Sequence, residues 1–328
     1  MSEKILELKD LSIRYTTDKI ISRAVNHVNL SLEKGEVLGL VGETGAGKTT
    51  TALSILGLLP KYTSEIDGEI LFEGENLVGA SEKKMRSIRG QKISMIFQDP
   101  MTSLNPVYKV GEQIGDVIRF HNPKIGRIEV EERVDGILNM VGIAPSRKND
   151  YPHQFSGGMK QRVMIAIAIA CNPDLLIADE PTTALDVTIQ AQVIRMMRNL
   201  QQELGSSVIL ITHDLGIVAN FCDKVAIMYG GEIVESGTLE EVFDKSRSHH
   251  PYTDGLFGSL PNITERTARL TPITGLTPHP SELPDGCKFH PRCPKCMDIC
   301  QKGDNPPKYV KDSHVIQCHL FTGKEAQS

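Results

Sequence analysis

The stretch that decides the fold is Val37–Thr50, which reads VLGLVGETGAGKTT. An apolar run, Val37–Val41, leads directly into Gly42-Glu43-Thr44-Gly45-Ala46-Gly47-Lys48-Thr49, which fits the pattern G-x-x-x-x-G-K-[ST]. A helical pattern follows from Thr50 to Leu59 and stops at Pro60. A strand, a glycine-rich loop and a helix in this order predict a phosphate-binding loop, because backbone N–H groups and the helix dipole attract an anion there.

This loop carries the first set of candidate site residues. Lys48 is expected to reach the β- and γ-phosphates of a nucleotide, and the Thr49 hydroxyl is expected to ligate Mg²⁺. The nucleotide is expected to contact the whole loop and the start of its helix: Gly42, Glu43, Thr44, Gly45, Ala46, Gly47, Lys48, Thr49 and Thr50.

A second motif ends in two adjacent carboxylates. The apolar run Leu175–Ala178 is followed by Asp179 and Glu180, at the strand end where open α/β sheets bind ligands. Asp179 is expected to hold Mg²⁺ through its water shell, and Glu180 to orient and activate an attacking water. A buried strand ending in Asp-Glu is common by itself, but its combination with the phosphate loop predicts a nucleotide site.

Further apolar runs extend this pattern into an α/β fold. Ile93–Phe97, Val208–Ile211 and Val225–Met228 are continuous rather than alternating, as in a sheet covered on both faces. Gln190–Leu204 has helical spacing between two of these runs. The alternation of strands and helices predicts a layered α/β domain.

Composition and charge restrict the class of protein. The 328 residues are 40% hydrophobic and predict about two domains of roughly 150 residues each. A net charge of −5 does not fit a protein that coats nucleic acid, so no nucleic-acid partner is expected. The longest apolar run near a helix, Val163–Cys171, is far shorter than the ~20 residues that span a bilayer. MSEKILELKD lacks a signal-peptide core, and a soluble, cytoplasmic chain is therefore expected.

A third glycine motif places the chain in a family. Phe155-Ser156-Gly157-Gly158-Met159 opens a helix, with Ser156 as a good N-cap. The stretch resembles the signature motif of ABC transporter ATPases, although Phe155 and Met159 depart from the usual L-S-G-G-Q. Other parts of that family's pattern follow in order and cover about residues 4–245: Tyr15 for adenine stacking, the Q-loop residue Gln98, the D-loop Ala184-Leu185-Asp186 and the switch residue His213.

The resemblance implies a site shared between two ATPase chains. Ser156, Gly157 and Gly158 would contact the γ-phosphate of ATP bound to the partner ATPase. Glu180, His213 and Gln98 would form the catalytic group, and Gln98 would also contact Mg²⁺ with Thr49 and Asp179. The implied fold is an ABC-type P-loop NTPase, with a RecA-like core at 1–95 and 160–245, a helical signature subdomain at 96–159 and a C-terminal extension at 246–328.

Three separate stretches resemble the ATPase subunits of dipeptide and oligopeptide importers. They are Gln98–Pro106, the tetrapeptide His250-Pro251-Tyr252-Thr253, and the cysteine-rich end of the chain. The resemblance implies two transmembrane permease subunits, a second ATPase, homo- or heterodimeric, and an external peptide-binding protein, with the chain peripheral on the cytoplasmic face of the membrane. The alternatives are a nickel-importer ATPase and a soluble ABC ATPase of iron–sulfur cluster assembly. Chromosome-maintenance and translation ABC proteins fit less well, since no coiled-coil insertion or second cassette is evident.

Five of the seven cysteines gather in the last 42 residues. In a reducing cytoplasm they are poor candidates for disulfides. This leaves zinc on four cysteines, or on three with His314 or His319, a four-iron cluster, or a metal-free extension. Spacing alone favours Cys293, Cys296 and Cys300 as ligands. The importer resemblance instead implies a [4Fe-4S] cluster on four cysteines and leaves Cys296 as a spare: Cys287, Cys293, Cys300 and Cys318.

Overall fold

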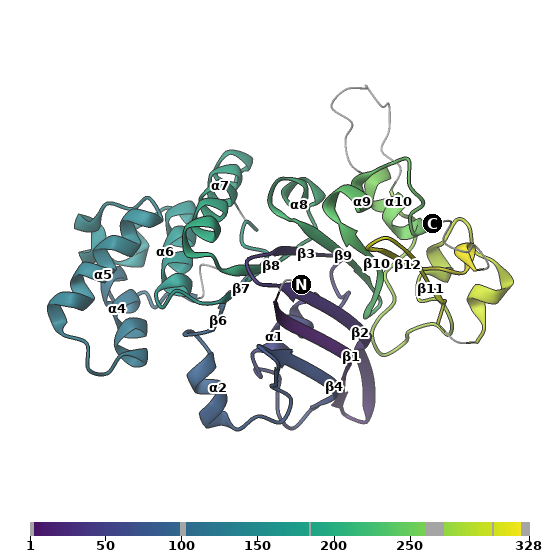
Figure 1. Ribbon diagram of the computed structural model, residues 1–328, viewed down its shortest axis with the longest axis horizontal. Helices are drawn as coiled ribbons and strands as arrows, with labels where there is room; N and C mark the ends of the chain where they lie inside the picture. The colour runs from purple at the N-terminus through teal and green to yellow at the C-terminus, as the bar shows by residue number, and fades with distance from the viewer. Residues whose placement is uncertain (1–2, 99–102, 184, 260–271, 304, 323–328) are drawn as a thin grey trace.

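The chain folds around one large sheet with a smaller sheet beside it, as Figure 1 shows for this computed structural model. The structure describes residues 3–98, 103–183, 185–259, 272–303 and 305–322. The large sheet has the strand order β11-β12-β10-β9-β3-β8-β7-β6. Its parallel part comprises β6 (Ile93–Ile96), β7 (Leu175–Asp179), β8 (Ser207–Thr212), β3 (Val37–Val41) and β9 (Lys224–Tyr229).

The parallel strands separate two hydrophobic cores. Every residue of β3, β7 and β8 is buried, which explains their unbroken apolar runs. On one face the sheet packs against α1 (Lys48–Ile55) and the small sheet, and on the other against three helices, α6 (Gly157–Ile169), α7 (Val187–Leu204) and α8 (Leu215–Phe221). Both faces are therefore covered, and only the strand ends are open to a ligand.

The small antiparallel sheet follows a different sequence pattern. It has the order β2-β1-β4-β5, formed by β1 (Lys4–Thr17), β2 (Ile20–Glu33), β4 (Ser64–Phe72) and β5 (Glu75–Asn76). Its strands mix buried and exposed residues, since one face packs on the core and the other meets solvent. Continuous apolar runs alone do not reveal these strands.

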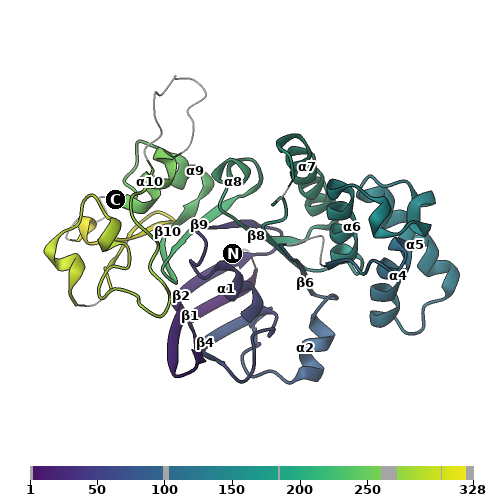
Figure 2. The same ribbon diagram turned by 180° about the vertical axis from the view of Figure 1, so that it is seen from behind.

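Helices form one end of the molecule. α4 (Val110–His121), α5 (Arg127–Met140) and α6 lie together at the end opposite the C-terminal extension in both views (Figures 1 and 2). They follow α2 (Glu82–Ile88) and β6, and the short 3₁₀ helices Pro145–Asn149 and Pro152–Gln154 lead into α6. No helix within the described ranges combines the length and the apolar character that crossing a bilayer requires.

The C-terminal extension is built onto the core sheet. α9 (Leu239–Phe243) and α10 (Pro251–Gly258) follow β10 (Glu232–Thr238), and then β12 (His314–Gln317) pairs antiparallel with β10 while β11 (Lys308–Lys311) pairs with β12. Tyr252 and Phe289 are fully buried in the main core. The extension therefore shares the core of the nucleotide-binding part.

A buried ion pair joins the extension to β10. The Glu235 carboxylate accepts hydrogen bonds from His249 Nδ1 at 2.7 Å and His314 Nε2 at 2.8 Å, and its other oxygen accepts one from the His250 N–H. Burial alone would raise the pKa of Glu235, but these hydrogen bonds lower it to about 2. The hydrogen bond to Glu235 raises the pKa of His249 against the effect of burial.

The structure confirms the α/β fold and the five strands predicted from apolar runs, each to within one or two residues. The helix expected at Thr50–Leu59 instead spans Lys48–Ile55. It starts earlier because Gly47 is the N-cap, and it ends earlier because Gly57 turns the chain with φ +59°.

We predict that Glu235→Gln destabilises the chain by about 3 kcal/mol at pH 5.5, because His249 must then either keep a buried charge without a counter-ion or give up its proton. The Glu235 carboxylate should contribute less to the free energy of unfolding as pH falls from 4.5 toward 2. The His249 charge should contribute less as pH rises from 6.5 through its raised pKa. Denaturant unfolding of the full chain measures both effects.

Glu232→Gln is the matched control on the same strand. Burial raises the pKa of Glu232 to about 7, so its side chain is already neutral at pH 5.5 and the amide should cost less than about 1 kcal/mol. Equal losses in the two variants would contradict the assignment of a charged pair at Glu235.

Candidate functional site

The carboxyl ends of four neighbouring parallel strands carry the candidate residues. The phosphate loop follows β3, His213 follows β8, Glu180 follows β7, and Gln98 lies two residues beyond β6. Because parallel strands end at the same edge, residues far apart in the sequence meet there. This edge is where the structure brings together most of the residues expected from the sequence.

Two glycines give the phosphate loop its shape. Gly42 lies so close to Met228 that a Cβ would stand 2.2 Å from the Met228 carbonyl oxygen. Gly47 has φ +104°, and a Cβ there would stand 2.4 Å from the carbonyl oxygen of Ala24. Backbone crowding, and for Gly47 also backbone conformation, therefore requires glycine at both positions.

Lys48 folds back over its own loop. Its Nζ donates to the carbonyl oxygens of Gly42 at 2.7 Å and Glu43 at 3.0 Å. Burial lowers the pKa of Lys48, while the charges of Glu180, Asp179 and Glu43 act in the opposite direction. The ammonium group thus lies among three carboxylates at the mouth of the loop, where it can exchange its carbonyl partners for phosphate oxygens.

Asp179 and Thr49 form a candidate magnesium pair. The Thr49 side chain hydrogen-bonds to the buried Asp179 carboxylate. Burial raises the pKa of Asp179, the Thr49 hydrogen bond lowers it, and the Glu180 charge raises it further. Hydroxyl and carboxylate oxygens are the ligands that Mg²⁺ takes in such sites, so these two residues fit the ion.

Glu180 is the centre of the hydrogen-bond network at this edge. One carboxylate oxygen accepts from Gln98 Nε2 at 3.0 Å and from the Thr183 hydroxyl at 2.9 Å, and the other pairs with His213 Nδ1 at 3.1 Å. Burial would raise its pKa, but the His213 and Thr183 hydrogen bonds and the His213 and Lys48 charges hold it below its ordinary value. The residue also has φ +46°, an uncommon conformation for a non-glycine residue and one found at functional sites.

Thr183 was not among the expected residues. It lies three positions after Glu180, and its own backbone N–H donates to the Glu180 carbonyl. The turn that joins β7 to the next segment therefore positions this hydroxyl, and no spacing rule used on the sequence identifies it. Of the D-loop, Leu185 and Asp186 are described, and Asp186 caps α7 by accepting from the Ile189 N–H. Ala184 lies outside the described residues.

The signature residues lie apart from the phosphate loop. Ser156 is the N-cap of α6 as expected, but its side chain makes no capping hydrogen bond. A Cβ on Gly158 would stand 2.6 Å from Ile189 of α7, so packing within the chain requires that glycine, whereas Gly157 is open. α6 and α1 are separated in both views (Figures 1 and 2). Within one chain the structure does not bring Ser156 to the phosphate loop.

Tyr15 lies on β1, half-buried, and packs against the core shared with α1.

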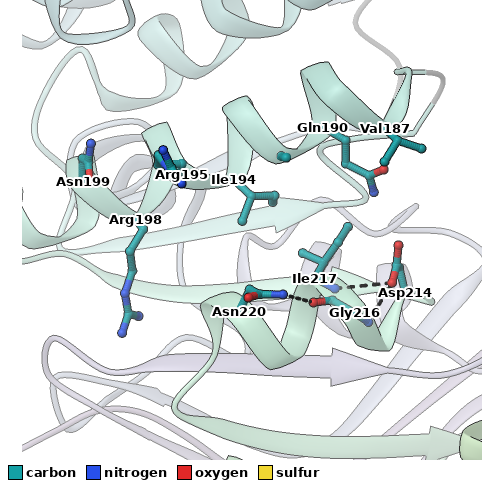
Figure 3. Close-up of a pocket in the computed structure, with 11 residues that line it drawn as sticks. Val187, Gln190, Ile194, Arg195, Arg198, Asn199, Asp214, Gly216, Ile217 and Asn220 are labelled. Atoms are coloured by element: carbon teal, nitrogen blue, oxygen red, sulfur yellow. Dashed lines mark hydrogen bonds between the residues drawn. The ribbon is translucent and has the colours of Figure 1, made fainter. Parts of the chain in front are cut away.

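Within the described residues a groove of 530 Å³ runs between α7 and α8, and Figure 3 shows its lining. Asp214 lines it, but none of the expected phosphate-contacting residues does. The groove is therefore separate from the strand edge that carries the candidate site.

Four of the five C-terminal cysteines face one another. Cys287 interacts electrostatically with Cys293, Cys300 and Cys318, and three of the four side chains are buried. Burial raises the pKa of Cys287 to about 12 and that of Cys318 to about 11. Cys296 is half-buried, donates weakly to the Met297 carbonyl oxygen and also interacts electrostatically with Cys293. The structure thus brings together the four cysteines expected from the importer resemblance, with Cys296 close to one of them.

Comparison with known proteins agrees with this geometry. Residues 25–183 match the ABC transporter family model, and residues 234–300 match the model of the oligopeptide/dipeptide transporter C-terminal region. The chain belongs to the ABC transporter family. The chain is therefore an ATPase. Lys48, Asp179 and Glu180 of its ATP-binding cassette lie together at the carboxyl edge of the sheet.

Relatives place it in the peptide-transport branch of that family. The dipeptide transport ATP-binding protein DppD of Bacillus subtilis is 47% identical over 97% of this chain and 95% of its own length. The oligopeptide transport ATP-binding protein OppD of the same species is 48% identical over 97% of this chain and 89% of its own. A solved cassette, MJ0796 as a dimer with ADP and phosphate, has a TM-score of 0.64 at 28% identity and covers 71% of this chain and 98% of its own.

We predict that Gly47→Ala destabilises the nucleotide-free chain more than Gly45→Ala. Both positions have positive φ, which costs an alanine roughly 1–2 kcal/mol. Only Gly47 adds a clash with the Ala24 carbonyl, whereas nothing lies within 4 Å of a Cβ on Gly45. Thermal unfolding without nucleotide compares the two variants, and equal losses would show that backbone crowding does not set this loop.

Proposed function

We propose that the chain hydrolyses ATP to drive the import of dipeptides or oligopeptides through a membrane transporter. The observation that carries the proposal is that one chain combines an ABC ATPase site with a C-terminal extension of the peptide-transporter type. An ABC site is arranged around Glu180, and a C-terminal extension that matches the peptide-transporter model shares its core. That match and the relatives favour peptide transport over nickel import or iron–sulfur cluster assembly.

The roles at the site follow from its contacts. Glu180 orients and activates the water that attacks the γ-phosphate, with Gln98 and His213 holding its carboxylate. Lys48 and the loop amides from Gly42 to Thr50 bind the phosphates, and Tyr15 stacks on adenine. Mg²⁺, held by Thr49 and Asp179 with Gln98 nearby, would neutralise charge on the phosphates.

A second ATPase chain completes the site. Ser156 and Gly157 are exposed at the start of α6, with no partner for the Ser156 hydroxyl among its own capping groups. These residues and Gly158 present a helix N-terminus, which favours an anion such as the γ-phosphate of ATP on the facing chain. ATP then holds the two chains together, and its hydrolysis lets them separate.

The segment Gln98–Pro106 is the proposed contact with the permease subunits. Gln98 bonds to Glu180, while Asn105 is fixed to Gln113 of α4 by two hydrogen bonds of 3.0 Å. The described ends of the segment therefore contact Glu180 at one side and α4 of the helical end at the other, and we propose that the segment transmits movement between them. Residues 99–102 lie outside the described residues. The proposed place is peripheral, on the cytoplasmic face of the membrane, with an external protein delivering peptide.

We predict that Glu180→Gln slows ATP hydrolysis by at least about 100-fold in the assembled transporter while ATP binding persists, because the amide cannot act as a base. Lys48→Ala should instead weaken ATP binding itself, since the variant loses the cation at the mouth of the loop. Single-turnover hydrolysis and equilibrium binding separate the two effects. Wild-type hydrolysis by Glu180→Gln would show that another group activates the water.

We also propose that Cys287, Cys293, Cys300 and Cys318 hold a [4Fe-4S] cluster. Backbone N–H groups of Phe289, Lys295 and Leu320 hydrogen-bond to three of the sulfurs and so favour their thiolate forms. Four-iron clusters are held by four thiolates and are tuned by such hydrogen bonds. The donor set thus fits the group, whose role here would be to hold the extension together.

Zinc fits this arrangement less well. Tetrahedral zinc with Zn–S bonds of about 2.3 Å requires sulfurs roughly 3.8 Å apart. Within the part of the chain that the structure describes, no three cysteine sulfurs lie within 4.8 Å of one another. A cluster binds each thiolate to a different iron atom and therefore accepts a wider set.

We predict that anaerobically purified chain is brown, with broad absorption that bleaches on reduction, and that Cys287→Ser loses iron. Cys296→Ser is the matched control and should keep its iron, because the Cys296 thiol is outside the proposed ligand set and donates to the Met297 carbonyl oxygen. Iron and zinc analysis with absorption spectra measures the outcome. Stoichiometric zinc in colourless protein would overturn the cluster, and loss of metal from Cys296→Ser would overturn the ligand set.

A further inference from the structure

The phosphate loop contains an acidic residue that a phosphate-binding loop does not need. Glu43 directly follows Gly42, and its backbone carbonyl accepts from Lys48 Nζ at 3.0 Å. A free carboxylate at this position would repel a triphosphate and attract Lys48 away from it. The Lys48 ammonium already interacts electrostatically with Glu43. Something must therefore neutralise Glu43 if ATP is to bind well.

The C-terminal extension supplies the counter-charge. Arg292 reaches Glu43 with both ends of its guanidinium group: Nη1 donates to one carboxylate oxygen at 2.6 Å and Nη2 to the other at 3.1 Å. Such a bidentate pair is the strongest arrangement available to an arginine and a carboxylate. The Thr277 hydroxyl, also from the extension, donates to the same carboxylate.

Arg292 is itself held rigidly. Its side chain is only 6% exposed, compared with 28% for Glu43. Its Nε donates to the Thr274 carbonyl oxygen at 3.1 Å, and its guanidinium group lies over the Tyr229 ring. These contacts hold the guanidinium group in one place, so it is positioned before any nucleotide arrives.

A second contact from the extension fixes the loop backbone at the same residue. Tyr252 of α10 is fully buried, and its hydroxyl accepts from the Glu43 N–H at 3.0 Å. Both the side chain and the amide of Glu43 are therefore tied to residues beyond β10. The extension therefore constrains the loop at this residue through both its side chain and its backbone.

We propose that Arg292 is a positioning residue for ATP binding: it neutralises Glu43 and holds that carboxylate away from Lys48, so that the extension keeps the phosphate loop ready for the triphosphate. This inference rests on the nucleotide-binding role proposed for the loop. It gives the extension a part in the ATPase site itself, besides any part in transporter assembly.

The test is a double-variant cycle on the full chain, with binding of a fluorescent ATP analogue in the presence of Mg²⁺ as the readout. Arg292→Gln should weaken binding about tenfold, because it leaves Glu43 unpaired beside Lys48. Glu43→Gln is the reference background of the cycle, because it removes the charge that Arg292 neutralises while keeping the loop amide. In that background Arg292→Gln should change binding by no more than about threefold relative to Glu43→Gln alone, because the harmful carboxylate is absent.

Two outcomes would overturn the inference. Folded Arg292→Gln could bind as tightly as the wild type, or the double variant could bind as weakly as Arg292→Gln. The second result is expected if the Arg292–Glu43 pair only holds the fold together, because removing both partners would then not restore ATP binding. Thermal unfolding without nucleotide checks that each variant is folded.

Further variants keep the test decisive. If Arg292→Gln does not fold, Arg292→Lys retains the charge and should bind within about threefold of the wild type, whereas a tenfold loss in the folded protein would contradict charge neutralisation.

Lys48→Ala separates this inference from the proposed site. If Lys48→Ala binds normally, the site itself is wrong; if it loses binding while Arg292→Gln keeps it, only the role of Arg292 fails.

Discussion

The constraint on which the structure depends is that backbone N–H groups must converge on a phosphate while no side chain fills the space. Gly42 and Gly47 meet this constraint by lying against the carbonyl groups of Met228 and Ala24. The loop can hold that shape only where β3 is buried between neighbouring strands. Asp179 and Glu180 lie at the end of β7, which is separated from β3 by one strand, β8. The double-sided sheet and its two cores are the means by which a short loop is held still.

The C-terminal extension is part of the same solution. It continues the core sheet through β12, buries Tyr252 and Phe289 with the core side chains, and joins β10 through the Glu235 ion pair. Arg292 and Cys293 are adjacent in the chain, so the segment that reaches the phosphate loop is also the segment that carries the cysteine group. A region that looks like an appendage in sequence therefore contributes directly to the environment of the ATP site.

Much of this could be predicted from sequence, and the misses have physical causes. Strands buried on both faces are continuous apolar runs and were found, as were the loop and the carboxylates after β7. The small sheet was missed because its one-sided burial breaks those runs. The pairing of β12 with β10 and the Arg292–Glu43 contact join residues far apart in the chain, and local patterns carry no information about such contacts. Thr183 was missed because a turn rather than a motif positions it.

In the proposed site ATP binds at the loop after β3, and a second ATPase chain completes the site. The most direct measurement is an experimental structure of the assembled ATPase pair with a non-hydrolysable ATP analogue and Mg²⁺. We expect the γ-phosphate of the analogue to lie on Lys48, with the signature helix of the second ATPase against it. Ser156 of this chain should face the nucleotide of the second ATPase in the same way. Nucleotide bound elsewhere, such as in the groove between α7 and α8, or a signature helix facing solvent in the closed pair, would contradict it.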